Sequence, residues 1–119
     1  MKIGVLGGGS WGTALAVHLA RKGHDVYIWE FFVEQAEEMQ NKRVCKLLPE
    51  AKLPDNITVS HRMEDVLLVS ETVLIAVPSD KVERTIEQAR VFLENQSIII
   101  CSKGFASNLK LLSEVVQEH

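Results

Sequence analysis

Three glycines near the N-terminus carry the strongest chemical signal in this chain of 119 residues. Gly7, Gly9 and Gly12 have the spacing G-x-G-x-x-G, which becomes informative where a strand precedes it and a helix follows. Here an apolar run over residues 2–6 comes first, and an apolar helical pattern follows directly. Such glycines allow a tight turn, close approach of the backbone to a pyrophosphate and close packing of helix on strand. The turn therefore predicts a dinucleotide as ligand.

The helix after this turn can bind phosphate without a basic side chain. Backbone N–H groups at a helix start lack partners within the helix, and the helix dipole favours negative charge there. Residues 7–12 contain no Lys or Arg, and the backbone makes one unnecessary. We therefore expect a pyrophosphate at the start of this helix.

Glu30 is the second candidate, because it directly follows a predicted strand from Asp25 to Trp29. It lies eighteen positions after Gly12, near where an acidic side chain accepts hydrogen bonds from the adenosine ribose. The carboxylate would repel the 2′-phosphate of NADP, and no Lys or Arg occurs between Lys22 and Lys42 to attract it. The sequence thus favours NAD over NADP. The plainer interpretation of Glu30 is a solvated carboxylate at a strand end.

Two aromatic residues, Phe31 and Phe32, come next. They offer a flat apolar wall to an adenine ring, although two aromatic residues after a strand more often serve local packing. Both interpretations stay open on the sequence alone.

Strand and helix patterns alternate along the chain, which is typical of an α/β fold with a doubly wound, mostly parallel sheet and helices on both faces. One Rossmann-type dinucleotide-binding domain over residues 1–119 suits the length and a hydrophobic content of 46%. A connection with two prolines, Leu47 to Asn56, is expected not to be helical. The expected strands are Lys2 to Leu6, Asp25 to Trp29, Ile57 to Ser60, Thr72 to Val77 and Ser97 to Cys101, and the expected helices follow Gly12, cover Val33 to Lys42 and His61 to Val69, begin at an N-cap on Ser79, and cover Asn108 to Gln117.

Ligands of such sheets bind beyond the carboxyl ends of the strands, where the winding reverses. Three loops should meet there, at residues 7–12, at Pro78-Ser79 and at Ser102-Lys103-Gly104. Pro78 is interpreted first as a strand stop and second as a ligand contact. Lys103 follows a buried strand and would suit an anionic substrate or the phosphate on the nicotinamide side, with a solvated loop lysine as the alternative.

Composition argues against several other classes of protein. A formal net charge of −3 and the lack of a basic run disfavour a nucleic-acid surface. No apolar stretch approaches the ~20 residues of a membrane span, so we expect no membrane insertion and a cytoplasmic protein. Cys45 and Cys101 lack metal-ligand spacing, and we expect neither a metal nor a disulfide.

Five segments together resemble the N-terminal domain of the bacterial NAD(P)-dependent glycerol-3-phosphate dehydrogenases. They are GGGSWGTALA from Gly7, the Trp29 that closes the second strand, LLPEAKLPDNITV from Leu47, AVPS from Ala76 and SKG from Ser102. The resemblance covers the whole chain, and the SWGTALA run and the Leu-Pro connection are more specific than the glycine pattern. It implies hydride transfer with NAD(P)H that interconverts dihydroxyacetone phosphate and sn-glycerol 3-phosphate, in glycerophospholipid biosynthesis.

The resemblance also implies residue roles. Ser10, Trp11, Phe31 and Phe32 would contact the cofactor, and Lys103 would contact both cofactor and substrate. Many relatives have a polar or basic residue where Glu30-Phe31-Phe32 stands, so this departure favours NAD or dual use. The candidate cofactor-binding residues are Gly7, Gly9, Ser10, Trp11, Gly12, Glu30, Phe31, Phe32, Pro78 and Lys103, with NAD as the cofactor and NADP as the alternative.

The resemblance places the family's catalytic lysine and most of its substrate-phosphate pocket in a helical C-terminal domain. We therefore expect that domain to be absent from this chain, no catalytic residue within residues 1–119, and a homodimer in the full-length enzyme. Two other functions stay open. A free-standing, non-catalytic module that senses NAD or adenylate would not need Lys103. Other two-domain dehydrogenases of small acids share the glycine turn, but Ser10-Trp11 and the Leu-Pro connection argue against them.

Overall fold

The structure is a computed structural model that describes residues 1–45 and 48–101. The predicted Ser102-Lys103-Gly104 loop and the predicted helix from Asn108 to Gln117 lie outside the described residues. A parallel sheet forms the centre, in the order β5-β2-β1-β6-β7. Its strands are β1 (Lys2–Leu6), β2 (Asp25–Trp29), β5 (Ile57–Ser60), β6 (Thr72–Ile75) and β7 (Ser97–Ile100).

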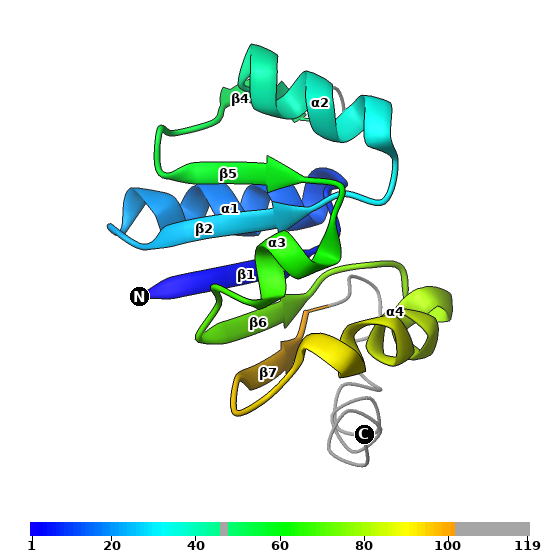
Figure 1. Cartoon of the computed structure of the whole chain (residues 1–119). Coiled ribbons are helices and arrows are strands. Elements are labelled where there is room, and N and C mark those ends of the chain that lie inside the picture. The colour runs from blue at the N-terminus through cyan, green and yellow to red at the C-terminus, as the bar shows by residue number, and fades with distance from the viewer. Residues whose placement is uncertain (46–47, 102–119) are drawn as a thin grey trace.

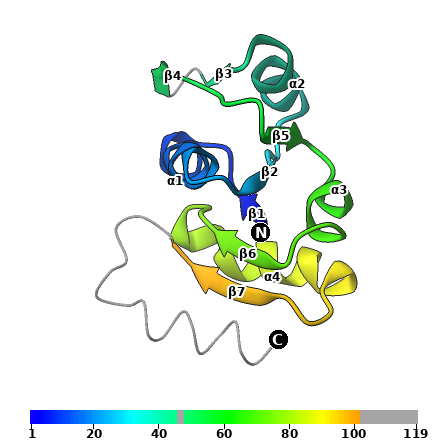
Figure 2. The same ribbon diagram turned by 90° about the vertical axis from the view of Figure 1, so that its left-hand side faces the viewer.

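Helices cover both faces of this sheet. Figures 1 and 2 show α1 (Ser10–Arg21) and α3 (Met63–Leu67) on opposite sides of it. The helix α2 (Val33–Lys42) shares a core with α1, and α4 (Val82–Ala89) shares a core with α3. The chain builds outward from β1 through β2 to β5 and then returns to add β6 and β7 on the other side. The predicted doubly wound α/β fold is confirmed, with the winding reversal between β1 and β6.

The alternation of side chains along each strand explains why two cores form. On β1, Ile3 and Val5 pack into the core under α1 and α2, whereas Leu6 belongs to the core under α3 and α4. Successive strand residues point to opposite faces, so a strand covered by helices on both sides must be apolar throughout. This requirement made β1 recognisable from the sequence.

The helix after β6 starts differently from the prediction. Ser79 was expected to cap it, but Ser79–Lys81 form a single 3₁₀ turn, η1, and α4 begins at Val82. The Lys81 N–H donates to the Pro78 carbonyl at 2.8 Å, and no side chain caps the turn. The N-cap prediction was wrong because the chain closes this corner through its backbone.

The proline-containing connection also holds more structure than expected. Its described part, residues 48–56, is not helical, as predicted, but β4 (Leu48–Lys52) pairs antiparallel with β3 (Val44–Cys45). Proline excludes a helix interior but is compatible with an edge strand. The sequence argument therefore predicted that residues 48–56 are not helical, but it missed the pairing of β3 with β4.

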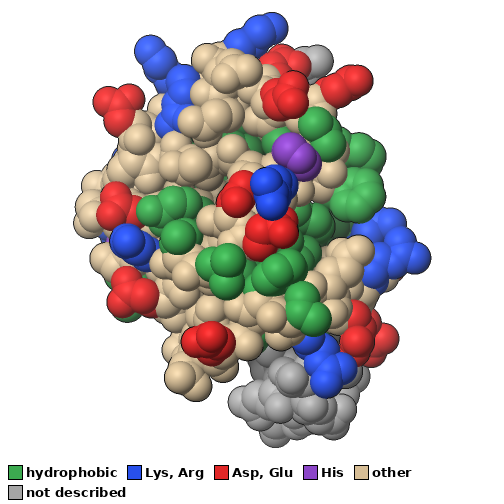
Figure 3. All heavy atoms as spheres, viewed as in Figure 1, with side chains coloured by type: hydrophobic (Ala, Val, Ile, Leu, Met, Phe, Trp, Pro, Cys, Tyr) green, Lys and Arg blue, Asp and Glu red, His purple; other side chains and the backbone are tan. Residues whose placement is uncertain are grey.

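Charged side chains of both signs are interspersed on the face in Figure 3, with apolar side chains gathered between them. Among residues 1–45 and 48–101 no helix is long and apolar enough to cross a membrane. The same part of the chain contains no group of three or more His, Cys, Asp or Glu that could hold a metal ion. Cys45 and Cys101 are free thiols, and burial raises the pKa of the Cys101 thiol.

Candidate functional site

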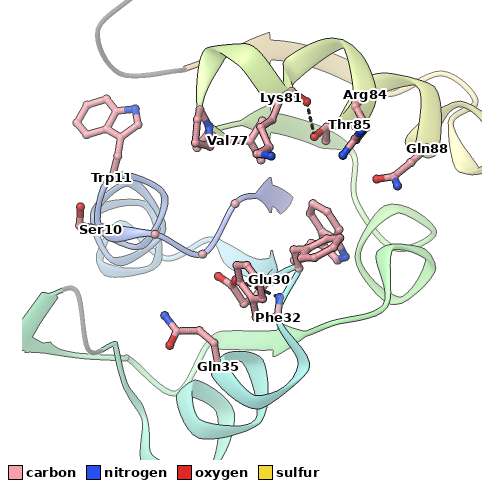
Figure 4. A pocket seen from close by; sticks show the side chains of 17 residues that line it. Ser10, Trp11, Glu30, Phe32, Gln35, Val77, Lys81, Arg84, Thr85 and Gln88 are labelled. Carbon is pink, nitrogen blue, oxygen red and sulfur yellow. Dashed lines mark hydrogen bonds between the residues drawn. The ribbon is translucent and has the colours of Figure 1, made fainter.

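A pocket of about 610 Å³ opens beyond the carboxyl ends of β1, β2 and β6, where the winding of the sheet reverses. Its walls come from the glycine turn, from the segment after β2, and from η1 and α4 (Figure 4). The lining residues are Gly7, Gly8, Gly9, Ser10, Trp11, Trp29, Glu30, Phe31, Phe32, Gln35, Ala76, Val77, Pro78, Lys81, Arg84, Thr85 and Gln88. This is where a ligand of a doubly wound sheet is expected to bind.

The glycine turn has the geometry that the spacing predicted. Gly7 has φ of +126°, and a Cβ there would lie 2.9 Å from the carbonyl carbon of Ala76. A Cβ on Gly12 would lie 1.9 Å from the Gly7 carbonyl oxygen. Gly12 itself is buried beneath the turn and does not line the pocket, so it shapes the site without facing a ligand.

The start of α1 is open to an anion. Gly9 is its N-cap residue, in extended backbone, and no side chain caps the helix. The first turn contains no acidic residue, and Ser10 and Trp11 both line the pocket. Unpaired N–H groups and the positive end of the helix dipole therefore border the pocket.

Glu30 is 7% exposed, so the interpretation as a solvated carboxylate is wrong. The backbone N–H of Phe32 donates a hydrogen bond to Oε1 of Glu30 at 3.3 Å. Burial raises the pKa of Glu30, while hydrogen bonds from the backbone of Phe32 and of Gly8 act in the opposite direction. The carboxyl group is thus held by the backbone at the pocket wall.

Gly8, which the motif leaves free, is constrained by this carboxyl group. A Cβ on Gly8 would lie 2.1 Å from Oε2 of Glu30 and 3.1 Å from its Cβ. The glycine turn and the end of β2 are therefore in direct contact, and sequence reasoning had given Gly8 no role.

Phe31 and Phe32 are not packed into the core, because their exposed fractions are 62% and 66%. Their rings meet edge to face, with centroids 5.1 Å apart, and Phe31 meets Trp29 in the same way at 6.2 Å. Trp29 itself is buried, and its Nε1–H donates to the His61 carbonyl at 3.1 Å. The two phenylalanines therefore present apolar surface to the pocket.

Trp11 and Pro78 border the pocket on the side of the glycine turn and η1. The Trp11 indole is 40% exposed, and its Nε1–H donates to the Cys101 carbonyl, which links the first turn of α1 to the end of β7. Pro78 lies three residues beyond the end of β6, so it does not terminate that strand. Its place is at the entry to η1, where it lines the pocket.

Sequence reasoning missed the wall formed by α4. Arg84, Thr85 and Gln88 line the pocket from this helix, together with its N-cap residue Lys81. The Thr85 hydroxyl donates to the Lys81 carbonyl at 2.8 Å (Figure 4). Their spacing of three, one and three places them on one helical face. Polar residues at this spacing, directly after a strand that ends at the crevice, could have predicted that this helical face lines the pocket. Gln35 of α2 was missed as well, and Lys103 lies outside the described residues.

Comparison with known proteins identifies the family. The model of the family described as NAD-dependent glycerol-3-phosphate dehydrogenase N-terminus matches residues 2–119. The chain belongs to this family. Among curated members of the glycerol-3-phosphate dehydrogenases, the NAD(P)+ enzyme of Thermoanaerobacter sp. (strain X514) is 38% identical over 121 residues, which cover 100% of this chain and 37% of the relative. The corresponding enzyme of Lysinibacillus sphaericus is 37% identical over 98% of this chain and 36% of the relative.

Solved glycerol-3-phosphate dehydrogenases share the fold. The crystal structure from Coxiella burnetii has a TM-score of 0.87 and 34% identity, over 98% of this chain and 37% of that one. The structure from Saccharomyces cerevisiae has a TM-score of 0.82 and 26% identity, over 99% of this chain and 38% of that one. The chain spans little more than a third of the length of these relatives.

Proposed function

We propose that this chain binds a nicotinamide adenine dinucleotide in the 610 Å³ pocket, as the cofactor-binding half of a glycerol-3-phosphate dehydrogenase. The observation that carries the proposal is the glycine turn. Gly12 packs so closely beneath Gly7 that no side chain fits between them, and the uncapped start of α1 opens into the pocket. This arrangement suits a pyrophosphate bound by backbone N–H groups.

The residues around the turn fit the other parts of such a cofactor. Glu30, buried at the pocket wall, would accept hydrogen bonds from the adenosine ribose. Phe31 and Phe32 would border the adenine, and Ser10, Trp11 and Pro78 would border the pyrophosphate and the half that carries nicotinamide. When bound, the cofactor supplies or accepts the hydride. The chain's own residues would bind and orient it.

The reaction we propose for the complete enzyme interconverts dihydroxyacetone phosphate and sn-glycerol 3-phosphate. It is supported by membership of the family and by the names of the relatives. Because the chain covers about 37% of those relatives, we propose that a further helical domain supplies the catalytic residue and most of the substrate site. Contact of Lys103 with the substrate, a homodimer and a cytoplasmic location stay predictions.

Calorimetric titration of the purified chain with NADH and with NADPH tests the proposal. We expect saturable binding of NADH, weaker binding of NADPH, and no oxidation of NADH by dihydroxyacetone phosphate. A folded chain that binds neither dinucleotide would contradict the cofactor role. Saturable turnover by the chain alone would contradict the assignment of catalysis to a second domain.

A substitution at Ser10 separates binding from folding. Ser10→Glu places a carboxylate in the first turn of α1, where the helix dipole stabilises negative charge. The variant should melt no lower than the unaltered chain but bind NADH at least tenfold more weakly, because the new charge repels the pyrophosphate. Ser10→Gln, similar in size and neutral, is the matched control and should bind much more tightly than Ser10→Glu.

A further inference from the structure

The wall of the pocket formed by α4 has no role in the binding scheme above. Arg84 projects from this helix into the pocket (Figure 4), and it lies three residues beyond Lys81 in the chain. The guanidinium of Arg84 is exposed and forms no ion pair with other residues in the described ranges 1–45 and 48–101. A cationic, planar group therefore faces the pocket from α4.

The aromatic pair lies on the facing wall. Figure 4 shows Phe32 on the β2 side of the pocket and Arg84 on the α4 side. Phe31 joins Phe32 at an interplanar angle of 86°, so the pair presents a ring face and a ring edge at right angles. Each of the two residues is more than half exposed. If Glu30 holds the adenosine ribose, as proposed above, the flat base attached to that ribose would lie between the Phe31–Phe32 pair and α4.

We propose that Arg84 completes a clamp for the adenine ring, with the base held between the guanidinium and the Phe31–Phe32 pair. This inference rests on the proposed dinucleotide binding. A guanidinium stacks on aromatic faces and is more weakly hydrated than an ammonium group, so it suits a base more than a lysine would. Every base offers a π face, and stacking between a base and an aromatic or Arg side chain is a common mode of recognition.

The position of Arg84 along α4 favours the base over the pyrophosphate. The proposed pyrophosphate site has its own donors at the start of α1, and Lys81, the last residue of η1, is the cation nearer to that side (Figure 4). Arg84 lies beyond Lys81, followed one turn later by Gln88, whose amide also lines the pocket. Along this wall the compact charge of Lys81 is followed by the planar guanidinium of Arg84 and the amide of Gln88.

Three substitutions of Arg84 separate the contribution of stacking from that of charge. The affinity of each variant is measured by calorimetric titration of the 119-residue chain with NADH and with ADP-ribose. Arg84→Ala should weaken both ligands about tenfold, because each carries the adenine. Arg84→Lys keeps the positive charge but loses the planar guanidinium, so its affinity for both ligands should fall almost as far as that of Arg84→Ala. Arg84→Trp keeps a flat surface without the charge and should bind within about threefold of the unaltered chain. Arg90→Ala is the control, because it removes a positive charge that does not line the pocket. Its affinities for NADH and ADP-ribose should equal those of the unaltered chain.

The adenine role is refuted if Arg84→Ala binds like the unaltered chain, or if Arg84→Lys does. It is also refuted if Arg84→Trp binds as weakly as Arg84→Ala. Circular dichroism confirms that each variant is folded, which is expected at an exposed helical position. If the unaltered chain does not bind NADH, the proposed function fails as well. If it binds NADH and Arg84→Ala binds equally, only the clamp fails.

Discussion

Replacing Gly12 with alanine should destabilise the domain, even though alanine is the better helix former. The new Cβ would lie 1.9 Å from the Gly7 carbonyl oxygen and 3.0 Å from the Gly7 carbonyl carbon. Both are backbone atoms, so no rotation of a side chain relieves the overlap. The first turn of α1 must move away from β1, and the glycine turn must change shape with it.

The size of the effect follows from two opposing contributions. Forcing an extra methyl group into a close-packed site costs about 3 kcal/mol at the upper end of the usual range, which suits an overlap with backbone. Alanine recovers about 1 kcal/mol of helix propensity. The net loss is about 2 kcal/mol, which for 119 residues lowers the melting temperature by about 8 °C.

Thermal and urea unfolding, followed by far-UV circular dichroism, measure this loss. Gly23→Ala is the matched control, because Gly23 has φ of +97° and an added Cβ would meet nothing within 4 Å. It should lose only the backbone preference, about 1 kcal/mol or about 4 °C, and keep its affinity for NADH. Gly12→Ala should also bind NADH more weakly. A melting temperature of Gly12→Ala within about 2 °C of the unaltered chain would refute the packing argument.

Three further outcomes follow from the site. Glu30→Gln should raise the affinity for NADPH relative to NADH about tenfold in paired titrations, because it removes a charge that repels the 2′-phosphate; an unchanged ratio would show that Glu30 does not select the cofactor. Because burial raises the pKa of Glu30 in the folded chain, its contribution to stability is fully present below the ordinary value of 4.5 and is lost as the pH rises through the raised native pKa. Urea unfolding across that window should therefore show a fall in stability with pH that is smaller in Glu30→Gln, and equal slopes would contradict the assignment. Trp11→Phe keeps an aromatic six-membered ring but loses the N–H that donates to the Cys101 carbonyl, so the free energy of unfolding should fall by about 1 kcal/mol, whereas an unchanged value would mean that the hydrogen bond contributes nothing in solution.

The sheet could be predicted from the sequence because burial on both faces leaves a clear pattern. The strands β1, β2 and β5 begin and end at the predicted residues, and each contributes buried apolar side chains to the core. The glycine turn was equally readable, since Gly7 adopts a left-handed φ and Gly12 leaves no room for a side chain. The overlap of Gly12 with Gly7, in particular, involves residues that are close in the chain.

Features that depend on distant neighbours were not predictable. The polar residues at position 81, the N-cap of α4, and at positions 84, 85 and 88 of the helix form a face that cannot be told from a solvated helix face in the sequence. Only the sheet order, which brings β6 beside β1, shows that this face borders the pocket. The burial of Glu30 likewise depends on Gly8, twenty-two residues earlier in the chain.

Gly8 in the glycine turn contacts Glu30 at the end of β2, although the G-x-G-x-x-G motif places no requirement on position 8. A side chain at position 8 would displace the Glu30 carboxyl group and contact the Glu30 Cβ, so the effects of substitutions at the two positions should not be additive. Gly8→Ala should be poorly tolerated beside glutamate and better tolerated once position 30 carries a shorter side chain, as in Glu30→Ser. An attempt to change cofactor preference at the end of β2 would therefore also change which residues the glycine turn can accept.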